Sequence, residues 1–520
     1  MLVVELNKVN FEYDVNSLVR AFYPKEQVRV LTPESKLEKR PLSINKIKEH
    51  DDTVKNAGQM SEQGNQEYRN DKEERCQEDI HFCIRLEEKD AVITINGRDY
   101  NWHWQETLEE GYKDGFKRFL YCVLSEITGK SLPWGNLTGI RPTKMAYAML
   151  EQGKGEEEII EYYRQKHYVS LEKAQLSLDI ARRERKLLAG VNYLDGYSLY
   201  IGIPFCPTTC LYCSFTSFPI GGYGKKVDTY IECLIKELEF VAETYGDKVL
   251  DSVYIGGGTP TTLEPEQIDR LLGNLKKMFD FSRVKEFTVE AGRADSITEE
   301  KLRVLYEYGV GRISVNPQSM KQETLDVIGR KASVKQVETA YGLARQVGFD
   351  NINMDLILGL PGELEEDVRH TIEKVTALGP DSLTVHSLAI KRASPLNRWL
   401  LENVDSMGER IALLHNTDET MRIAAEGAAK LGMVPYYLYR QKNMSGNFEN
   451  VGYAKEGKFG LYNILIMEEK QSIVACGAGS ISKRVYPDGR IERCENVKDV
   501  NLYIEKIDEM IERKRGLFAD

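Results

Sequence analysis

The sequence predicts an α/β protein built around a partial (β/α)6 barrel, with a small N-terminal α/β domain and a C-terminal α+β extension. Three observations predict this fold class. From residue 198 onward, short apolar segments alternate with amphipathic ones in six units of about thirty residues, which favours a parallel sheet with right-handed crossovers. Polar residues and glycines follow the ends of the apolar segments, where such barrels carry their sites. The 520 residues are also enough for two or three domains.

The first predicted domain covers residues 1–130. Its segments alternate between strand patterns and helices of apolar periodicity. We expect strands at residues 2–6, 27–31, 81–86 and 91–95 and helices at residues 14–22 and 107–128. Lys, Glu, Asp, Asn and Gln dominate residues 32–79, so we expect a flexible polar insertion there, with a binding arm as the alternative.

A helical linker is predicted over residues 131–195. Its helices are expected at about 142–152, 155–165 and 170–188. Before them, Pro133-Trp-Gly-Asn-Leu-Thr-Gly-Ile-Arg-Pro-Thr-Lys144 is punctuated by Gly and Pro, which indicates a loop. Because the loop holds a Trp and two cations, it either packs against a neighbour or faces a ligand, and a structural linker is an equal alternative.

The barrel is predicted over residues 196–400. Its strands are expected at residues 198–204, 252–255, 286–290, 312–315, 351–357 and 382–385, and its helices at 227–245, 265–279, 298–308, 322–328, 335–347 and 364–377. The α+β extension covers residues 401–520 and is expected on one side of the barrel mouth. We expect a long helix from about 405 to 431, strand-like segments at 434–439, 460–467 and 471–476, and a helix at 499–514.

Composition excludes several classes of protein. The net charge of −11 argues against nonspecific nucleic-acid binding, which needs a basic face. No apolar run approaches membrane-spanning length, and the first residues lack the pattern of a signal peptide. Nine cysteines, an odd number, fit a reducing compartment better than a disulfide framework. We therefore expect a cytoplasmic protein with no membrane span and no nucleic-acid partner.

Three cysteines follow the first predicted barrel strand in Cys206-Pro-Thr-Thr-Cys210-Leu-Tyr-Cys213. Clustered thiolates suit zinc or an iron–sulfur cluster. A closed zinc site needs a fourth ligand, yet the next Cys is Cys233 and the next His is His370. A cubane held by three thiolates leaves one iron open. Three structural thiols or a disulfide are the alternatives.

This cysteine loop resembles that of the radical S-adenosylmethionine (SAM) enzymes. The resemblance implies a [4Fe-4S] cluster whose open iron binds SAM, and a 5′-deoxyadenosyl radical that removes a hydrogen atom from the substrate. Gly256-Gly-Gly-Thr-Pro260 follows the next strand and resembles the motif that holds the amino group of SAM in that family. The motif lacks the spacing of a nucleotide-phosphate loop. A glycine-rich structural turn is the alternative.

Glu290, Gln318 and Arg330 stand at or near later strand ends, and Asp355 lies inside an otherwise apolar strand. An acidic residue within an apolar strand is costly unless it is paired. Each residue alone is as compatible with a structural role as with a functional one. Their placement on successive strands favours a site at this edge of the barrel.

Residues 198–485 resemble the radical SAM family of oxygen-independent coproporphyrinogen III oxidases. The motifs are Tyr200-Ile-Gly-Ile-Pro-Phe-Cys206, the cysteine triad, Gly256-Gly-Gly-Thr-Pro-Thr261, Val315-Asn-Pro-Gln318, Ile328-Gly-Arg330, Asp355-Leu-Ile-Leu-Gly-Leu-Pro-Gly362 and Gly477-Ala-Gly-Ser-Ile481. The loop from Pro133 and the extra N-terminal domain make the HemZ branch (coproporphyrinogen dehydrogenase HemZ) the most similar, over nearly the full chain. The resemblance implies contacts to one or two SAM molecules by Tyr200, Tyr212, Gly257, Gly258, Thr259, Glu290, Gln318, Arg330, Asp355, Ala389 and Ile481.

The resemblance implies haem biosynthesis: the oxidative decarboxylation of coproporphyrinogen III to protoporphyrinogen IX by a monomer that takes electrons from a donor such as flavodoxin or ferredoxin. The four substrate carboxylates need cations, and the candidates are Arg141, Lys144, Arg440 and Lys442. Phe215 stands where the best-known members carry a fourth cysteine. A haem-binding chaperone of the same family and a radical SAM enzyme acting on haem therefore remain alternatives.

Overall fold

The structure is a computed structural model that describes residues 2–34, 80–105, 111–391, 394–404, 406–441, 444 and 448–518. Most of the predicted polar insertion lies outside these residues. The chain forms two compact units, Met1–Ser131 and Leu132–Asp520. Within the described ranges, no helix combines the length and apolar character needed to cross a lipid bilayer.

The first unit is a five-stranded mixed sheet in the order β2-β1-β3-β4-β5. Its elements are β1 (Leu2–Leu6), α1 (Glu12–Phe22), β2 (Val28–Leu31), β3 (Ile80–Leu86), β4 (Asp90–Ile95), β5 (Arg98–His103) and α3 (Tyr112–Thr128). Aromatic edge contacts join the two helices: Phe22 lies 5.3 Å from Tyr121 between ring centroids. Sequence analysis missed β5. The turn Asn96-Gly97, with φ values of 48° and 80°, reverses the chain into it.

The second unit is organised by an eleven-stranded sheet in the order β14-β15-β13-β12-β11-β10-β9-β6-β16-β17-β18. Six central parallel strands form the partial barrel: β6 (Gly196–Ile203), β9 (Val249–Gly257), β10 (Glu286–Gly292), β11 (Arg312–Val315), β12 (Ile352–Leu358) and β13 (Ser382–Ser387). The predicted partial (β/α)6 barrel is confirmed.

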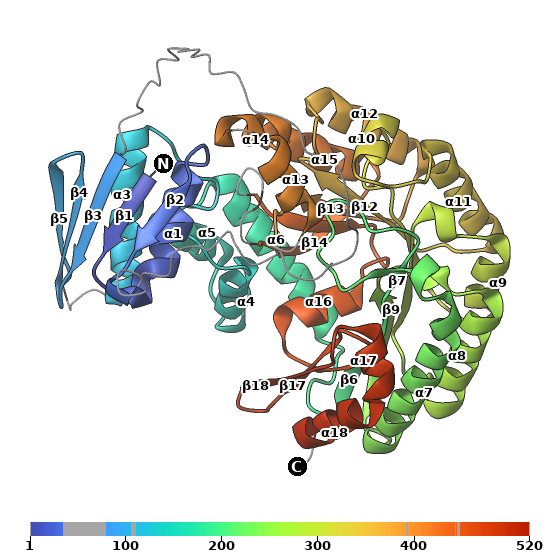
Figure 1. The fold of residues 1–520 in the computed structure, drawn as a ribbon. Helices are drawn as coiled ribbons and strands as arrows, with labels where there is room; N and C mark the ends of the chain where they lie inside the picture. Colours follow the sequence, from blue (N-terminus) through green and yellow to red (C-terminus); the bar gives the residue numbers. More distant parts are fainter. Residues whose placement is uncertain are drawn as a thin grey trace, which may run out of the picture. The chain divides into compact units, whose positions relative to one another are not determined.

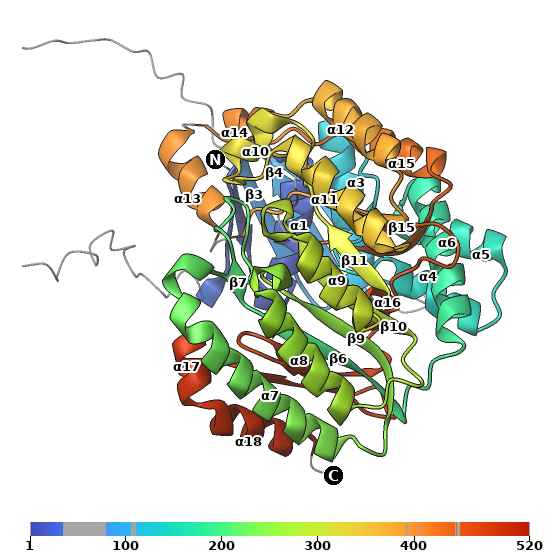
Figure 2. The same ribbon diagram turned by 90° about the vertical axis from the view of Figure 1, so that its right-hand side faces the viewer.

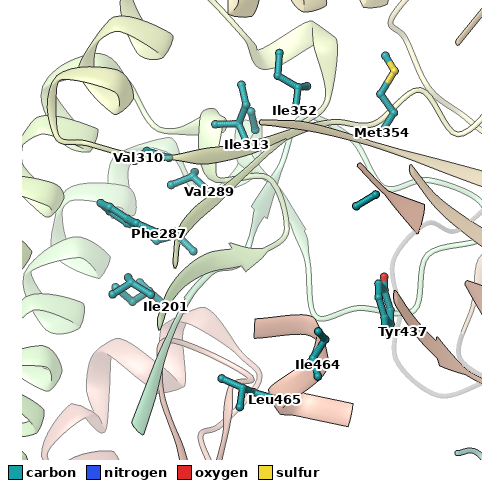
Figure 3. Close-up of a cluster of buried hydrophobic side chains, with 14 of the residues drawn as sticks. Ile201, Phe287, Val289, Val310, Ile313, Ile352, Met354, Tyr437, Ile464 and Leu465 are labelled. Atoms are coloured by element: carbon teal, nitrogen blue, oxygen red, sulfur yellow. The ribbon is translucent and has the colours of Figure 1, made fainter. Parts of the chain in front are cut away.

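Helices cover the outer face of these strands (Figure 2). They are α7 (Val227–Thr244), α8 (Pro265–Met278), α9 (Glu299–Glu307), α10 (Gln322–Val327), α11 (Val334–Val347) and α12 (Glu365–Leu378). Ile201, Val289 and Ile313 come from three strands and belong to the buried cluster beneath the helices (Figure 3). Burying these apolar side chains on one face leaves the alternate, more polar residues of the strands for the inner face.

The linker forms a helical layer of α4 (Thr143–Glu151), α5 (Glu156–His167) and α6 (Leu171–Leu188). The loop that precedes it is packed against a neighbour. Trp134 is fully buried, and its Nε1 donates to Glu449 Oε2 at 2.7 Å. Lys173 Nζ binds the other oxygen of Glu449, also at 2.7 Å. This part of the loop is therefore structural.

The C-terminal segments extend both edges of the barrel. Beside β13 lie β15 (Asn450–Ala454) and β14 (Val434–Tyr439), and beside β6 lie β16 (Ser472–Cys476), β17 (Ile481–Val485) and β18 (Ile491–Glu495). The remaining helices are α13 (Pro395–Asn403), α14 (Met407–Leu413), α15 (Asp418–Lys430), α17 (Val500–Glu505) and α18 (Ile507–Phe518). The predicted helix from about 405 to 431 is thus two helices. Thr417 begins the second as an N-cap whose side chain accepts from the Thr420 N–H.

The predicted strand at 460–467 is wrong: these residues form the helix α16 (Leu461–Glu468). The helix lies on the side of the sheet away from α8 and α9 (Figures 1 and 2). Ile464 and Leu465 join the buried cluster shown in Figure 3, and Tyr462 is also buried. Because side chains around much of the helix are buried, the segment lacks the amphipathic period by which helices are recognised.

Candidate active site

The three predicted cluster ligands lie on the loop after β6. Cys206 and Cys210 are buried, Cys213 is half-buried, and all three are free thiols. The loop is tied to a later barrel unit, since Leu211 N–H donates to the Ile328 carbonyl at 2.9 Å. Within the described ranges, no three His, Cys, Asp or Glu side chains are arranged to hold a single metal ion. Because this hydrogen bond fixes the loop, the three thiols share one anchored segment at the carboxyl end of β6.

Two guanidinium groups lie beside Cys210. Arg293 Nη1 donates to its Sγ at 3.5 Å, and Arg330 lies within electrostatic reach of the same thiol. Burial raises the pKa of the Cys206 and Cys213 thiols, so their thiolate forms need compensating positive charge. A donor set of three thiols beside two cations fits a [4Fe-4S] cluster that leaves one iron for another ligand.

The glycine loop after β9 lies directly against the cysteine loop. Gly258 N–H donates to the Ile203 carbonyl and Thr259 N–H to the Phe205 carbonyl, each at 2.7 Å. A Cβ on Gly258 would lie 2.5 Å from the Phe205 oxygen, which no side chain tolerates. Thr259 Oγ1 lies 3.4 Å from Cys206 Sγ. Glycine is thus required where the two loops meet.

Glu290 lies at the end of β10 on the inner face of the barrel. Tyr254 Oη donates to its Oε1 at 2.5 Å, and Tyr462 stacks on Tyr254 with ring centroids 4.5 Å apart. Burial, and less strongly the charge of Asp355, raise the pKa of Glu290 from 4.5 to about 7. The Tyr200 ring lies 6.2 Å from the Tyr254 ring and 6.1 Å from the Tyr462 ring between centroids, so the three rings form one cluster. The carboxyl group therefore sits beside an aromatic wall with few polar partners.

Gln318 and Asp355 are joined through their backbones. Gln318 N–H donates to the Asp355 carbonyl at 2.9 Å, and Gln318 has a φ of 68°. A non-glycine residue in this left-handed region is typical of ligand sites. The Gln318 Oε1 is buried and accepts no hydrogen bond from the part of the chain that the structure describes. A buried amide oxygen of this kind is available to a ligand donor.

Arg330 and Tyr212 connect the cysteine loop to this group. Arg330 Nη2 donates to Tyr212 Oη at 3.3 Å, and its Nη1 donates to the Asn316 carbonyl. Asn316 Oδ1 in turn accepts from the Asp355 N–H at 3.2 Å. The predicted residues Tyr212, Gln318, Arg330 and Asp355 thus form one connected set with the cysteine loop.

The last two predicted SAM contacts, Ala389 and Ile481, come from the sides of the barrel. Ala389 follows β13 and pairs with Met444 in an isolated bridge. Ile481 begins β17 and is 42% exposed. A buried ion pair fixes the turn before Ile481. Gly477 N–H donates to Glu237 Oε2 at 2.7 Å, and the buried Lys514 binds Oε1 of the same carboxylate at 2.5 Å. That both residues contact SAM stays a prediction.

The cations predicted to bind substrate carboxylates have different surroundings: Arg141, Lys144, Arg440 and Lys442. Arg141 Nη2 is paired with Glu469 Oε2 at 2.8 Å. Arg440 is buried, and its guanidinium lies 5.7 Å from the Trp134 ring. Lys144 is exposed, and Lys442 lies outside the described residues. Both arginines therefore have structural partners, and their role toward a substrate stays a prediction.

Sequence analysis missed four residues of this inner face: Tyr254, Arg293, His386 and Tyr462. His386 Nε2 lies 4.0 Å from Asp355 Oδ2, and burial lowers the pKa of the imidazole. The signal for Tyr254 and His386 was period-two alternation, since each points to the same side of its strand as a neighbouring polar or glycine position. Tyr462 comes from α16, so no strand pattern could have found it.

Comparison with known proteins agrees with this site. The radical SAM superfamily profile matches residues 200–375. The oxygen-independent coproporphyrinogen-III oxidase-like protein HemZ of Bacillus subtilis is 38% identical over 457 residues, which is 84% of this chain and 89% of HemZ. The fold and the cysteine loop thus define a radical SAM protein, a class that uses a [4Fe-4S] cluster and SAM.

Two further relatives are matched over shorter regions. The haem chaperone HemW of Bacillus subtilis is 37% identical over 37% of this chain and 51% of its own length. The oxygen-independent coproporphyrinogen III oxidase of Pseudomonas aeruginosa is 31% identical over 46% of this chain and 53% of its own length. The chain thus spans about half the length of these two relatives. It belongs to the radical SAM family of oxygen-independent coproporphyrinogen III oxidases, HemZ and HemW.

Proposed function

We propose that this protein catalyses the oxygen-independent conversion of coproporphyrinogen III to protoporphyrinogen IX. One observation carries the proposal: three free thiols on one loop lie beside two arginines and against the Gly257–Thr259 turn, at the barrel edge where Glu290 and Asp355 also lie. The similarity to HemZ over 84% of this chain supports the choice of a tetrapyrrole substrate.

The protein's own residues would divide the work by position. Cys206, Cys210 and Cys213 would hold the cluster, and Arg293 and Arg330 would offset the charge of the thiolates. With SAM bound, the cluster would supply one electron and thereby a 5′-deoxyadenosyl radical.

The SAM-binding side would use groups that keep hydrogen-bonding capacity beyond their contacts within the protein. The Gly257–Gly258 backbone would approach the amino acid end of SAM, and Glu290 and the unpartnered Gln318 amide would bind its hydroxyl and amine donors. The Tyr200, Tyr254 and Tyr462 stack would exclude water from the inner face.

The substrate chemistry balances with one external acceptor. For each of two propionate groups, a hydrogen atom would pass from the β-carbon to the 5′-deoxyadenosyl radical, which becomes 5′-deoxyadenosine. The carboxylate would leave as CO2 and one electron would pass to an acceptor, which yields a vinyl group. The cluster would be reduced by an external donor such as flavodoxin or ferredoxin, and we propose that the protein acts as a monomer in the cytoplasm.

The test is anaerobic reconstitution with iron and sulfide, followed by mass analysis of 5′-deoxyadenosine and of the porphyrin products. We expect four irons per chain, cleavage of SAM, and loss of two CO2 from coproporphyrinogen III. Cys210→Ser should lose SAM cleavage, whereas Cys494→Ser, on β18, should keep it. SAM cleavage with unchanged coproporphyrinogen III would refute the proposed substrate.

A haem chaperone is the second candidate function. Phe215 occupies the position two residues after Cys213, and HemW is among the relatives. Spectral titration with haem separates the two functions: tight stoichiometric haem binding without decarboxylation would favour the chaperone.

A further inference from the structure

A lysine that sequence analysis did not single out lies beside the cysteine loop. Lys391 follows β13, the last of the six parallel strands, and its Nζ lies 5.4 Å from the centre of the Phe215 ring. Its charge also reaches the Cys213 thiol and the His386 imidazole. The ammonium group therefore lies beside the cysteine loop and is near enough to His386 of the inner face to influence its charge.

Both members of this pair are exposed. Phe215 is 72% exposed, the largest exposed fraction given for any large hydrophobic side chain among the described residues. Lys391 is also exposed, and no carboxylate of the described residues lies within ion-pair distance of its Nζ. In a chain of net charge −11, an unpaired cation next to an exposed ring is a place for a ligand that is both apolar and anionic.

The other cations near the site are already engaged. Arg293 Nη2 is paired with Asp295 at 2.6 Å. Arg330 donates to Tyr212 and to a backbone carbonyl. Arg141, one of the four cations predicted from the sequence, is paired with Glu469. Recognition of a substrate carboxylate by any of these would have to displace a partner, whereas Lys391 has no carboxylate partner among the described residues to displace.

We propose that Lys391 and Phe215 form the subsite that recognises the tetrapyrrole substrate at the barrel mouth. The ammonium group binds one propionate carboxylate, and the phenyl ring packs on the adjacent pyrrole ring. This inference rests on the proposed function for the identity of the ligand. It adds the residues that select a carboxylated tetrapyrrole over a neutral one.

The test measures binding, so that it does not depend on turnover. The reconstituted holoprotein is titrated with coproporphyrin III, which carries four carboxylates, and with its neutral tetramethyl ester. Lys391→Met should weaken binding of the tetracarboxylate about tenfold and leave the ester unchanged. Lys391→Arg should retain binding of the tetracarboxylate. Phe215→Ala should weaken both ligands about fivefold.

Lys335→Met is the matched control. The Lys335 side chain, on α11, is 83% exposed, and its one ion pair among the described residues is with Glu338 of the same helix, so its loss should leave the affinity for both porphyrins unchanged. The absorbance of the cluster and the affinity for SAM are measured for every variant. They should equal those of the unmodified protein.

Three outcomes would overturn the subsite: equal affinity of the unmodified protein for the tetracarboxylate and the ester, no change in Lys391→Met, or loss of the cluster in that variant. Failure of the proposed function has a different signature. Carboxylate-selective binding that depends on Lys391, without formation of vinyl products, would leave the subsite standing and refute the reaction.

Discussion

Glu286 and Glu290 lie four residues apart on β10, where Glu286 is buried and Glu290 is half-buried, and their surroundings differ. Glu286 accepts from Thr288 Oγ1 at 2.9 Å, from the Tyr462 N–H at 3.3 Å and from the Leu461 N–H. Glu290 has Tyr254 as its side-chain donor, and Asp355 opposes its charge.

This difference separates a structural carboxylate from a candidate binding group. Glu286 caps the first N–H groups of α16, which have no partners within the helix, and its negative charge suits that end of the helix dipole. Glu290 is left with bonding capacity that the protein does not use. On one strand, a glutamate near the amino end therefore caps a helix, and a glutamate near the carboxyl end keeps acceptor capacity for a ligand.

The largest effect is expected from Glu286→Ala. The substitution leaves the N–H groups of Leu461 and Tyr462 without this acceptor and removes the countercharge of the buried Arg312. We therefore expect the free energy of unfolding to fall by about 4 kcal/mol. Urea unfolding measures it. Glu286→Gln retains an acceptor oxygen and should lose less than half as much; an equal loss in both variants would contradict the capping role.

A smaller, pH-dependent effect is expected from Glu290→Gln in the SAM-free protein. The pKa of Glu290 is raised from 4.5 to about 7 in the folded state, so the folded state binds its proton more tightly than the unfolded state does. The contribution of protonated Glu290 to the free energy of unfolding is complete below about pH 4.5 and is lost as the pH rises through 7. It amounts to about 3 kcal/mol.

Urea unfolding at several pH values tests this second prediction. In the unmodified protein the free energy of unfolding should fall between about pH 4.5 and 7, and in Glu290→Gln this fall should be much smaller. The same variant should bind SAM about tenfold more weakly at pH 8. Unchanged SAM affinity in this variant would remove Glu290 from the binding site.

The smallest effect is expected from Tyr254→Phe. The hydrogen bond from Tyr254 lowers the pKa of Glu290, so its loss should raise that pKa further. The midpoint of the pH dependence of SAM binding should then move to higher pH, while stability falls by about 1 kcal/mol. Isothermal titration between pH 6 and 9 measures the midpoint, and an unmoved midpoint would show that Tyr254 does not act through Glu290.

The same contrast explains what could be predicted from the sequence. The barrel strands and the residues at their ends follow from alternation along the chain, which is why Glu290 and Asp355 were found. The partners that give those residues their character come from distant segments. The role of Tyr462 depends on α16, and the pairing of Arg141 depends on Glu469, 328 residues further along the chain. Such contacts leave no local period in the sequence.

The placement of β15 and β16 at opposite edges of the barrel has a consequence for synthesis on the ribosome. While a nascent chain ends before residue 450, the outer edges of β6 and β13 have no strand beside them. Unpaired strand edges such as those of β6 and β13 are templates for pairing with other chains. We expect ribosome-bound intermediates of this length to depend on chaperones, and chains truncated after residue 440 to accumulate in inclusion bodies.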